Sequence, residues 1–404
     1  MKVAFETLGC KLNQAETESL ARQFVCAGHD IVDGADKADI YVLNTCTVTH
    51  TADAKSRHLL RLAHRRNPDA VLVVTGCYAQ RAASQLTKID GVNLVVGNDE
   101  KNNLLKIIKE AGYLDKHRKD APLSSKSLLR TRTFLKIQDG CHNFCAYCIV
   151  PFVRNKEVSV PPDIVVNDVK QRTREGYQEV VLTGTRAGAY NYDGVDLKEL
   201  LMRLLEETEI PRLRLSSLQP GEISSELIDL WKNNRLCPHF NMSLQSGSVG
   251  VLARMKRRYT LTDFERSVNI IREKVPAVAI TTDIIVGFPG ETDEEFKESI
   301  EFCRRMEFAR IHVFPYSPRS GTKAAEMPGQ IADSIKKERS RIMLKLAEEV
   351  SRKFREKFTG ESFDVLWEKQ TGEGVWSGVT GNYIRVFSKD SRDLSNKLVT
   401  VEIK

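Results

Sequence analysis

The cysteines of this sequence are grouped in a way that suits iron or zinc chemistry. Three of them form the run C-x-x-x-C-x-x-C, namely Cys141, Cys145 and Cys148. Three others each end a strand-like segment: Cys10, Cys46 and Cys77. The last three have no partner at ligand spacing, and we expect them to be packing residues: Cys26, Cys237 and Cys303. The sequence has no signal-peptide pattern and no long apolar run, so we expect a cytoplasmic protein, in which grouped cysteines more often bind metal or act in catalysis than form disulfides.

The C-x-x-x-C-x-x-C run offers three thiolates on one short loop. Three thiolates can hold three irons of a 4Fe–4S cluster and leave the fourth iron without a protein ligand. An amino acid can chelate that open iron through its amine and carboxylate, and a reduced cluster can then pass an electron to a bound sulfonium. The alternative is a structural zinc site, which needs four protein ligands and would have to recruit His142.

Cys10, Cys46 and Cys77 admit two interpretations. Free cysteine is often a small buried residue, and strand ends are common places for it. However, each of the first three strand-like segments ends in cysteine, in the tripeptides LGC, NTC and TGC. This regularity favours a second three-cysteine cluster site, again with one open iron.

The elements that position these cysteines belong first to an N-terminal α/β domain. Strand-like runs are Val3–Leu8, Asp39–Asn44, Val71–Thr75 and Leu94–Val96, and helical periodicity covers Gln14–Ala27 and Ala52–Arg66. Alternating strands and helices predict a parallel sheet with helices on its faces, in which ligands bind at the carboxyl ends of the strands. The three cysteines are therefore expected to meet at one edge of this sheet.

A second and longer βα alternation begins near residue 133. Its strand candidates are Thr133–Gln138, Val180–Thr183, Arg212–Ser216, Phe240–Leu244, Ile280–Val286 and Arg310–Phe314. Its clearest helices are Leu197–Glu207, Thr262–Lys274, Asp293–Met306 and a long basic last helix, Ile331–Phe358. Six βα units predict a complete or partial barrel.

The chain of 404 residues suits two or three domains. We expect an N-terminal domain over 1–115, a basic linker over 116–132, a partial (β/α)6 barrel over 133–358 and a small β-barrel over 359–404. The last segment alternates Gly and β-branched residues with aromatic residues and lacks helical periodicity.

The net charge of +7 is too small to prove a nucleic-acid partner. Basic residues gather in Lys55–Arg66, Lys116–Lys136, Arg254–Arg258 and the helix after residue 335. Such helix faces are often only solvated. The candidates for RNA contact are Arg61, Arg65, Arg66, Arg130 and Arg257. The tail has six basic and seven acidic residues, so RNA binding there would depend on aromatic stacking.

The cysteine loop on this kind of barrel resembles that of the radical S-adenosylmethionine (SAM) enzymes. Combined with the three-cysteine N-terminal domain and the β-barrel tail, it resembles the methylthiotransferase family over essentially the whole chain. The tail is similar to the RNA-binding TRAM domain. The residues that carry the resemblance are LGCKLNQAE (8–16), NTCTVTHTADAKSR (44–57), VTGCYAQ (74–80), DGCHNFCAYCIVPFVR (139–154), LQSGS (244–248), DIIVGFPGET (283–292) and YSPRSGTKA (316–324).

The resemblance implies radical transfer of a methylthio group to tRNA. One 4Fe–4S cluster, on the C-x-x-x-C-x-x-C cysteines, would reductively split SAM, and the deoxyadenosyl radical would remove hydrogen from C2 of a modified adenosine beside the anticodon. An auxiliary 4Fe–4S cluster on Cys10, Cys46 and Cys77 would carry the sulfur. The implied further partners are an electron donor such as flavodoxin or ferredoxin and a sulfur source, with no membrane.

The segment after Cys46, Thr-Val-Thr followed by Ala-Asp-Ala-Lys-Ser-Arg, resembles the branch that acts on N6-threonylcarbamoyladenosine (t6A) in tRNA. The alternatives within the family are isopentenyl-adenosine in tRNA or an Asp of a ribosomal protein. A more distant alternative is a non-catalytic zinc-binding RNA protein, which would leave the six βα units unexplained.

A turn of sequence GFPGE joins a strand to a helix and suits a SAM contact. Gly287 would let the backbone approach the ligand, and Glu291 would favour the start of the helix. The further candidates for SAM contact are Tyr147, Thr183, Gly184, Gln245 and Asp283, each with a purely structural role as the alternative. The sequence departs from the family pattern at Thr185-Arg186 and at Asn155, near the expected active-site mouth.

Overall fold

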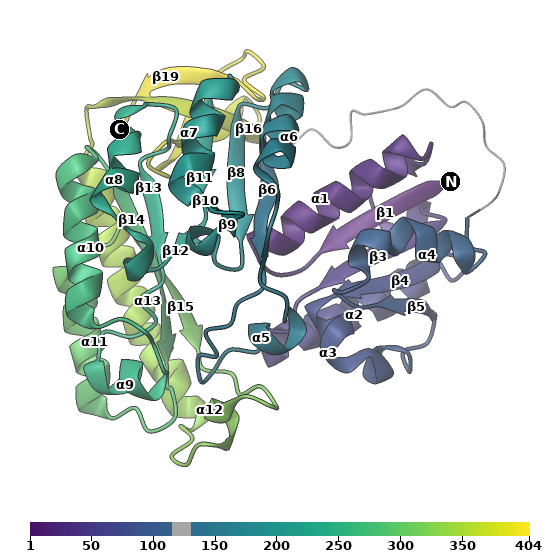
Figure 1. Ribbon diagram of the computed structural model, residues 1–404, viewed down its shortest axis with the longest axis horizontal. Helices are drawn as coiled ribbons and strands as arrows, with labels where there is room; N and C mark the ends of the chain where they lie inside the picture. The colour runs from purple at the N-terminus through teal and green to yellow at the C-terminus, as the bar shows by residue number, and fades with distance from the viewer. Residues whose placement is uncertain (115–130) are drawn as a thin grey trace.

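The computed structural model describes residues 1–114 and 131–404. The described chain forms an N-terminal α/β unit, a central βα unit and a C-terminal sheet (Figure 1). Most of the expected linker, and with it Arg130, lies outside the described residues. Among the described helices, none combines the length and apolar character needed to cross a membrane.

The N-terminal unit is a five-stranded parallel sheet in the order β2-β1-β3-β4-β5. Its strands are β1 (Lys2–Thr7), β2 (Asp30–Ile31), β3 (Ile40–Thr45), β4 (Val71–Gly76) and β5 (Val92–Val96). The four strands predicted from sequence are confirmed, and the short edge strand β2 is additional. The order reverses between β1 and β3, which is the kind of switch point where open α/β sheets bind ligands.

Helices cover both faces of this sheet. They are α1 (Lys11–Cys26), α2 (His50–Arg66), α3 (Cys77–Leu86) and α4 (Leu104–Glu110), with single 3-10 turns η1 (Ala35–Lys37) and η2 (Lys101–Asn103). Leu20 and Phe24 of α1 share one apolar core with α4, whereas Leu60 of α2 and Tyr78 of α3 belong to the core on the other face. Burial on both faces explains why β3 and β4 are almost uniformly apolar.

The central unit is a partial barrel built from two short sheets, whose strands run parallel except for the antiparallel edge strand β7. One has the order β11-β8-β6-β7 and the other β12-β13-β14-β15. The strands are β6 (Arg132–Asp139), β7 (Val158–Ser159), β8 (Glu179–Gly184), β11 (Arg212–Leu215), β12 (Ser217–Leu218), β13 (His239–Met242), β14 (Ala279–Val286) and β15 (Arg310–Pro315). The predicted strand Arg212–Ser216 corresponds to β11. After a break at Ser216 the chain continues as β12, which lies beyond the predicted strand and pairs in the other sheet. A parallel bridge between Leu213 and Leu236 continues the barrel across this split.

The barrel helices pack outside the strands. They are α5 (Val150–Val153), α6 (Pro162–Arg174), α7 (Leu197–Glu207), α8 (Ser225–Ile228), α9 (Val249–Arg254), α10 (Leu261–Lys274), α11 (Asp293–Arg305), α12 (Lys323–Glu326) and α13 (Asp333–Glu356). Smaller elements are β9 (Asn191–Tyr192), β10 (Val195–Asp196), η4 (Ala187–Ala189), η5 (Pro220–Glu222) and η6 (Asp229–Lys232). Capping boxes fix the starts of α7, α10 and α11, which explains why these helices were easy to delimit from sequence.

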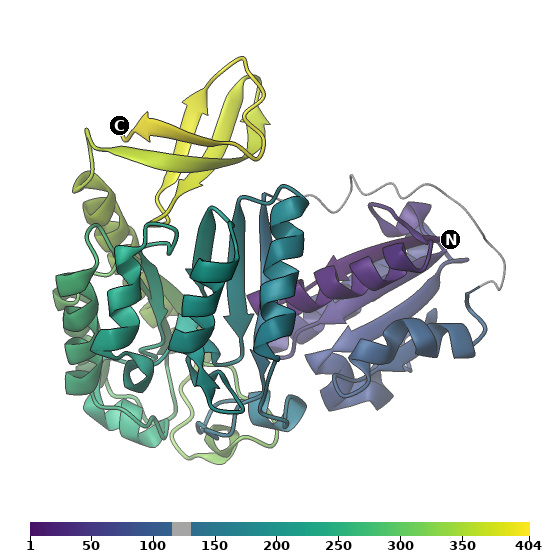
Figure 2. The same cartoon turned by 45° about the horizontal axis from the view of Figure 1, so that its top comes forward.

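The tail is a four-stranded antiparallel sheet in the order β18-β17-β16-β19. Its strands are β16 (Ser362–Gly372), β17 (Val375–Thr380), β18 (Arg385–Lys389) and β19 (Leu398–Glu402). The expected small barrel is therefore a half-barrel, because β18 and β19 form its two edges and are not paired. The sheet lies over the end of the central barrel at which the strands begin (Figure 2).

Helix α1 joins the N-terminal unit to the central barrel. It lies against β6 (Figure 1), and the Thr133 hydroxyl donates to Glu18 Oε1 at 2.5 Å. Arg22 forms an ion pair of 2.8 Å with Glu175, beyond the end of α6. This docking brings the first turn of α1, which follows Cys10, to the interior of the partial barrel.

Candidate active site

A cavity of about 580 Å³ lies between the carboxyl edge of the N-terminal sheet and the interior of the partial barrel. Cys10, Cys46 and Cys77 all line it. The barrel contributes residues from β8 and from β12 to β15, and the tail contributes Tyr383. The three cysteines, separated by 36 and 31 positions in the sequence, therefore open into one space, as their places after parallel strands predicted.

Two glycines allow the cysteines to come together. A Cβ on Gly9 would lie 2.7 Å from Cys46 Cβ, so only glycine lets Cys46 pack beside the segment that carries Cys10. Gly76 has a φ of 100°, and a Cβ there would lie 2.4 Å from the Thr45 carbonyl oxygen. The glycines of LGC and TGC are thus required by close backbone approach and by left-handed conformation.

Each of the two chain segments that follow these glycines starts a helix at its cysteine. Cys10 is the N-cap residue of α1, and Cys77 is the first residue of α3. Unpaired backbone N–H groups at a helix start favour negative charge, and this lowers the cost of holding a thiolate there. Burial acts in the opposite direction and raises the pKa of the Cys46 thiol to about 12. A cation bound to the sulfur would offset that burial.

Arg154 contacts this thiol group from the barrel. Its Nε donates to Cys77 Sγ at 3.4 Å, and Asn98 Nδ2 donates to the same sulfur at 3.6 Å. Asn98 also donates to the carbonyl of Val153, the residue before Arg154, at 2.8 Å. Arg154 follows α5, directly after the C-x-x-x-C-x-x-C loop, so it links the two cysteine groups.

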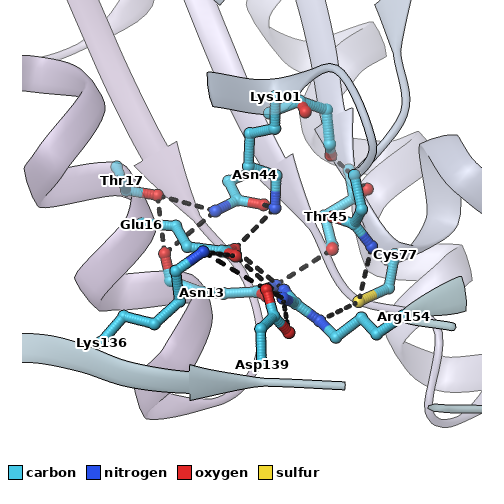
Figure 3. Close-up of polar contacts among 12 residues, drawn as sticks. Asn13, Glu16, Thr17, Asn44, Thr45, Cys77, Lys101, Lys136, Asp139 and Arg154 are labelled. Carbon is cyan, nitrogen blue, oxygen red and sulfur yellow. Dashed lines mark hydrogen bonds and ion pairs between the residues drawn. The ribbon is translucent and has the colours of Figure 1, made fainter. Parts of the chain in front are cut away.

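The Arg154 guanidinium is held by acids from both units (Figure 3). Its NH1 lies 2.8 Å from Glu16 Oε1 of α1 and 2.8 Å from Asp139 Oδ1 at the end of β6. Its NH2 donates to Glu16 Oε2 at 2.8 Å and to Asn13 Oδ1 at 2.9 Å. All five donor groups of a guanidinium point in a fixed fork, so this set of partners fixes both position and orientation.

Glu16 is the centre of this network (Figure 3). Lys101 Nζ lies 2.6 Å from Glu16 Oε2, and Lys136 Nζ lies 3.3 Å from Oε1. Burial alone would raise the pKa of Glu16, but Lys101 and Arg154 together hold it well below its usual range. Glu16 is therefore an ionised buried acid whose charge is balanced by cations from both units.

The C-x-x-x-C-x-x-C loop forms a second group of neighbouring thiols. The Cys148 backbone N–H donates to the Cys145 carbonyl at 2.9 Å, and burial raises the pKa of the Cys148 thiol to about 12. Arg257 NH1 donates to Cys145 Sγ at 3.3 Å and to the Tyr147 hydroxyl at 3.3 Å. Each cysteine group thus has one arginine that donates to a sulfur, Arg154 in one and Arg257 in the other.

The donor chemistry fits two 4Fe–4S clusters better than zinc. Each cysteine of such a cluster binds a different iron, so the three sulfurs need not converge on one point. Within residues 1–114 and 131–404, no three His, Cys, Asp or Glu side chains are placed to hold a single ion. His142, the fourth ligand of the zinc alternative, instead has its Nε2 2.8 Å from the Asn155 carbonyl oxygen.

Three of the residues expected to contact SAM line the cavity: Thr183, Gly184 and Asp283. Tyr147 and Gln245 do not. Gln245 has a φ of 72°, and its backbone pairs with β14 through Asp283 and Ile285. Tyr147 lies between two cysteines of the loop and meets Arg257.

Gly287 and Glu291 stay candidates for SAM contact, and both pack against α13. The space beside Gly287 is filled by Lys336 of α13, whose Cγ would lie 2.3 Å from a Cβ at this position. Glu291 is buried and forms an ion pair of 2.7 Å with Arg339 of α13. Helix α11 begins at Asp293 and is capped by Thr292, so Glu291 ties α13 to the turn and does not start the helix.

The residues proposed for RNA contact fall in different places. Arg61, Arg65 and Arg66 are exposed on α2. Because α2 runs back along the sheet from its start near Cys46, Arg65 and Arg66 lie roughly 25 Å from that end at 1.5 Å per residue. They are therefore away from the cavity mouth. Arg257 is not on an exposed basic face: its guanidinium lies 4.7 Å from the Tyr259 ring centroid and contacts the cysteine loop.

The two departures from the family pattern have structural roles. Thr185 Oγ1 donates to Asp139 Oδ1 at 3.4 Å, and Arg186 Nε donates to Glu222 Oε1 at 2.6 Å. The carbonyl of Asn155 contacts His142. Arg186 NH1 also donates to Asn143 Oδ1 at 3.3 Å, which joins the loop after β8 to the loop that carries the cysteines.

Several site residues were not singled out from the sequence. Arg154 and Glu16 are separated by 138 positions, and only the docking of the two units brings them together. Lys101 meets Glu16 within the N-terminal unit, 85 positions later in the sequence. Arg319, which is buried, donates to Thr47 Oγ1 at 2.9 Å and pairs with Asp53. The signal for Arg319 was present in YSPRSGTKA, where a charged residue interrupts a turn. The tail residue Tyr383 also enters the barrel and stacks on His239 with ring centroids 4.5 Å apart.

Comparison with family models and known proteins agrees with this arrangement. Residues 2–97 match a family model described as the uncharacterized protein family UPF0004, and residues 135–303 match the radical SAM superfamily. The chain is 39% identical to a threonylcarbamoyladenosine tRNA methylthiotransferase, MtaB, of Bacillus subtilis (strain 168), over 99% of this chain and 93% of that protein. It is 41% identical to the MtaB of Aquifex aeolicus (strain VF5), over the full length of both.

More distant matches have other names. A tRNA-2-methylthio-N(6)-dimethylallyladenosine synthase of Endomicrobium trichonymphae is 32% identical over 100% of this chain and 97% of its own. Among solved structures, the radical SAM methyltransferase TsrM of Kitasatospora setae has a TM-score of 0.60 at 15% identity, covering 80% of this chain and 77% of that one. That likeness supports the fold alone. The relatives that match along the whole length show that the chain belongs to the radical SAM methylthiotransferase family.

Proposed function

We propose that this protein transfers a methylthio group to C2 of N6-threonylcarbamoyladenosine beside the anticodon of tRNA. The observation that carries this proposal is the placement of the two cysteine groups on either side of the interface between the N-terminal unit and the barrel. Arg154, which follows one cysteine group in the sequence, contacts Cys77 of the other. The names of the two relatives at 39% and 41% identity support the choice of base. We place the reaction in the cytoplasm, where tRNA is modified.

The two cysteine groups would hold the two clusters. Cys141, Cys145 and Cys148 would bind the radical SAM cluster, and Cys10, Cys46 and Cys77 the auxiliary cluster. When bound, these groups supply the electron that splits SAM and the sulfur that is transferred. The domain limits stay a proposal: 1–115 for the auxiliary cluster, 116–132 for the linker, 133–358 for the radical SAM cluster and 359–404 for the tail.

The residues of this chain position and shield the reactants. Arg154 holds the edge of the N-terminal sheet against the end of β6 through Glu16 and Asp139, so it sets the separation of the two cysteine groups. Thr183, Gly184 and Asp283 would contact SAM or the base from inside the barrel. The cavity, at about 580 Å³, has the size of pockets that bury a nucleotide-sized ligand and exclude water.

Further partners follow from the chemistry. Reduction of a cluster needs an electron donor such as flavodoxin or ferredoxin, and each transfer consumes one sulfur atom from a sulfur source. Arg61, Arg65 and Arg66, on the outer part of α2, are proposed to meet the tRNA away from the reacting base.

The test is mass spectrometry of tRNA nucleosides from cells that lack the gene. The methylthio form of threonylcarbamoyladenosine should disappear and return on expression of the wild-type protein, but not of Cys46→Ala or Cys145→Ala. The methylthio form of isopentenyl-adenosine should stay constant in all strains. Loss of the isopentenyl form with the threonylcarbamoyl form intact would assign the chain to the other tRNA substrate and refute the proposal.

A further inference from the structure

Two cations in the cavity have no hydrogen-bonded acid partner, and Asp283 is the lining carboxylate whose charge acts on one of them, Lys11. Neither Lys11 of α1 nor Arg310 of β15 forms a hydrogen bond or an ion pair with any described residue. By contrast, Arg154 is paired with Glu16 and Asp139. The cavity thus contains two cationic groups that no described acid pairs with directly.

These cations lie on facing walls of the cavity. In β15, alternate residues share one face, and Arg310, His312 and Phe314 all line the cavity. Lys11 comes from the first turn of α1 on the other side, and its Nζ lies 5.9 Å from the centroid of the Tyr383 ring. Tyr383 lines the same cavity, so the Lys11 ammonium lies well inside it, next to the tail residue that enters the barrel.

The lining of the cavity contains little negative charge. Asp283 is the single carboxylate among the lining residues that the structure describes. It accepts a hydrogen bond from Asn241 Nδ2 at 3.4 Å. Arg154 is already paired with Glu16 and Asp139, but Lys11 and Arg310 together still outnumber Asp283. An anionic group on a ligand is therefore favoured over a neutral or apolar one.

We propose that Lys11 and Arg310 form a subsite for the carboxylate of the modified base, which is the threonyl carboxylate in N6-threonylcarbamoyladenosine. This inference rests on the proposed function and extends it to the residues that select the substrate. A dimethylallyl substituent has no charge and gains nothing from either cation. Lys11 and Arg310 are therefore specificity-determining residues, which favour an acidic N6 substituent over an apolar one.

An RNA phosphate carries the same kind of charge and is the other source of an anion. Lys11 is half-buried and lies beside Tyr383, whereas phosphates of a folded anticodon loop lie on the outside of the RNA. The interior position therefore favours the substituent of an inserted base.

The experiment compares two anticodon stem-loop RNAs that differ at one group. One carries N6-threonylcarbamoyladenosine, and the other carries the same substituent with its carboxylate replaced by a carboxamide. Binding is measured anaerobically by fluorescence anisotropy with reconstituted protein. Wild type should bind the carboxylate RNA about 10- to 100-fold more tightly, the range of a charge-assisted hydrogen bond. Lys11→Met and Arg310→Met should each reduce that ratio by at least about threefold.

Controls separate this effect from others. Lys232→Met removes an exposed lysine of η6 outside the cavity and should keep the wild-type ratio. Iron content should be unchanged in Lys11→Met, which is next to Cys10. Arg310→Met is remote from all six cluster cysteines in the sequence and gives the independent test.

Two results would overturn the inference. In one, each variant lowers the affinity for the two RNAs by the same factor, which indicates a phosphate contact. In the other, wild type does not distinguish the two RNAs. Failure of the proposed function looks different: wild-type protein would then methylthiolate an isopentenyl-adenosine stem-loop and leave both threonylcarbamoyl RNAs unmodified.

Discussion

Arg154 Nε lies 3.4 Å from Cys77 Sγ, although the two residues belong to different structural units. The arginine follows the C-x-x-x-C-x-x-C loop of the barrel, and the cysteine begins α3 of the N-terminal unit. The side chain of Arg154 therefore contacts Cys77, a ligand of the proposed auxiliary cluster. In the sequence, Arg154 lies six residues after Cys148, a ligand of the proposed radical SAM cluster. The distance between the two cysteine groups depends on this contact.

The variant Arg154→Lys tests that dependence. Lysine keeps the charge but cannot bind Cys77, Glu16 and Asp139 together, because it lacks the guanidinium fork. We expect methylthiolation to fall at least about tenfold, the effect of losing one well-placed contact of about 1.4 kcal/mol or more. Release of 5′-deoxyadenosine from SAM should continue at close to the wild-type rate.

The matched control is Arg203→Lys, which changes an arginine in surface ion pairs on α7. It should leave both rates unchanged. Equal loss of deoxyadenosine release and methylthiolation in Arg154→Lys would show that the arginine supports the fold or the first cluster in general, contrary to a positioning role.

The low pKa of Glu16 predicts a pH dependence of stability. A carboxylate whose folded pKa is well below the unfolded value of 4.5 stabilises the fold above pH 4.5 and loses this contribution as pH falls through the folded pKa. Wild type should therefore lose up to about 1.4 kcal/mol of unfolding free energy per pH unit from this group below pH 4.5.

Glu16→Gln removes this titration. Its unfolding free energy, measured with denaturant between pH 3 and 6, should be lower than that of wild type at pH 6 and fall less steeply in acid. Parallel pH curves for the two proteins would contradict the assignment of Glu16 as the ionised centre of the network.

The tail offers one exposed large aromatic side chain for RNA. Trp367 and Trp376 are buried in the core of the half-barrel, whereas Phe387 on β18 is 58% exposed. Stacking on a base contributes about 1–3 kcal/mol, so Phe387→Ala should weaken tRNA binding by about that amount. Filter binding at fixed salt provides the measurement, with Met202→Ala on α7 as an exposed apolar control. Unchanged affinity in Phe387→Ala would exclude stacking by this residue.

Arg65 and Arg66 test the electrostatic contact. If each neutralises one phosphate, replacing both by alanine should weaken tRNA binding and lower the slope of log affinity against log salt by about 2. Arg352→Ala, an exposed arginine of α13, is the comparison. A slope equal to that of wild type in the double variant would place the RNA elsewhere on the protein.

The strands and their cysteines were predictable because the signals are local. Cys10, Cys46 and Cys77 each follow a parallel strand of the N-terminal sheet. Parallel strands end at the same edge, so these three cysteines had to converge. The packing around the Gly287 turn was not predictable from the sequence, for a different reason. Its open side is filled by Lys336 from the last barrel helix, 49 positions later, and no local pattern reports that packing.

The same limit applies to charges between units. Arg257 follows other basic residues and had the pattern of an exposed face, but the fold places its guanidinium against Tyr259 and Cys145. The entry of Tyr383 into the barrel depends on how the tail docks on the ends of the strands. Helical periodicity and strand alternation each report on one helix or strand. They therefore cannot predict contacts that form only when one structural unit packs against another.

Iron analysis of anaerobically reconstituted protein tests the two-cluster site most directly. Wild type should contain about eight iron atoms, the total for two four-iron clusters, and both Cys46→Ala and Cys145→Ala should contain about four. Cys303→Ala, which changes a buried cysteine of α11, should retain about eight. A wild-type content near four that Cys46→Ala leaves unchanged would contradict a cluster on the N-terminal cysteines.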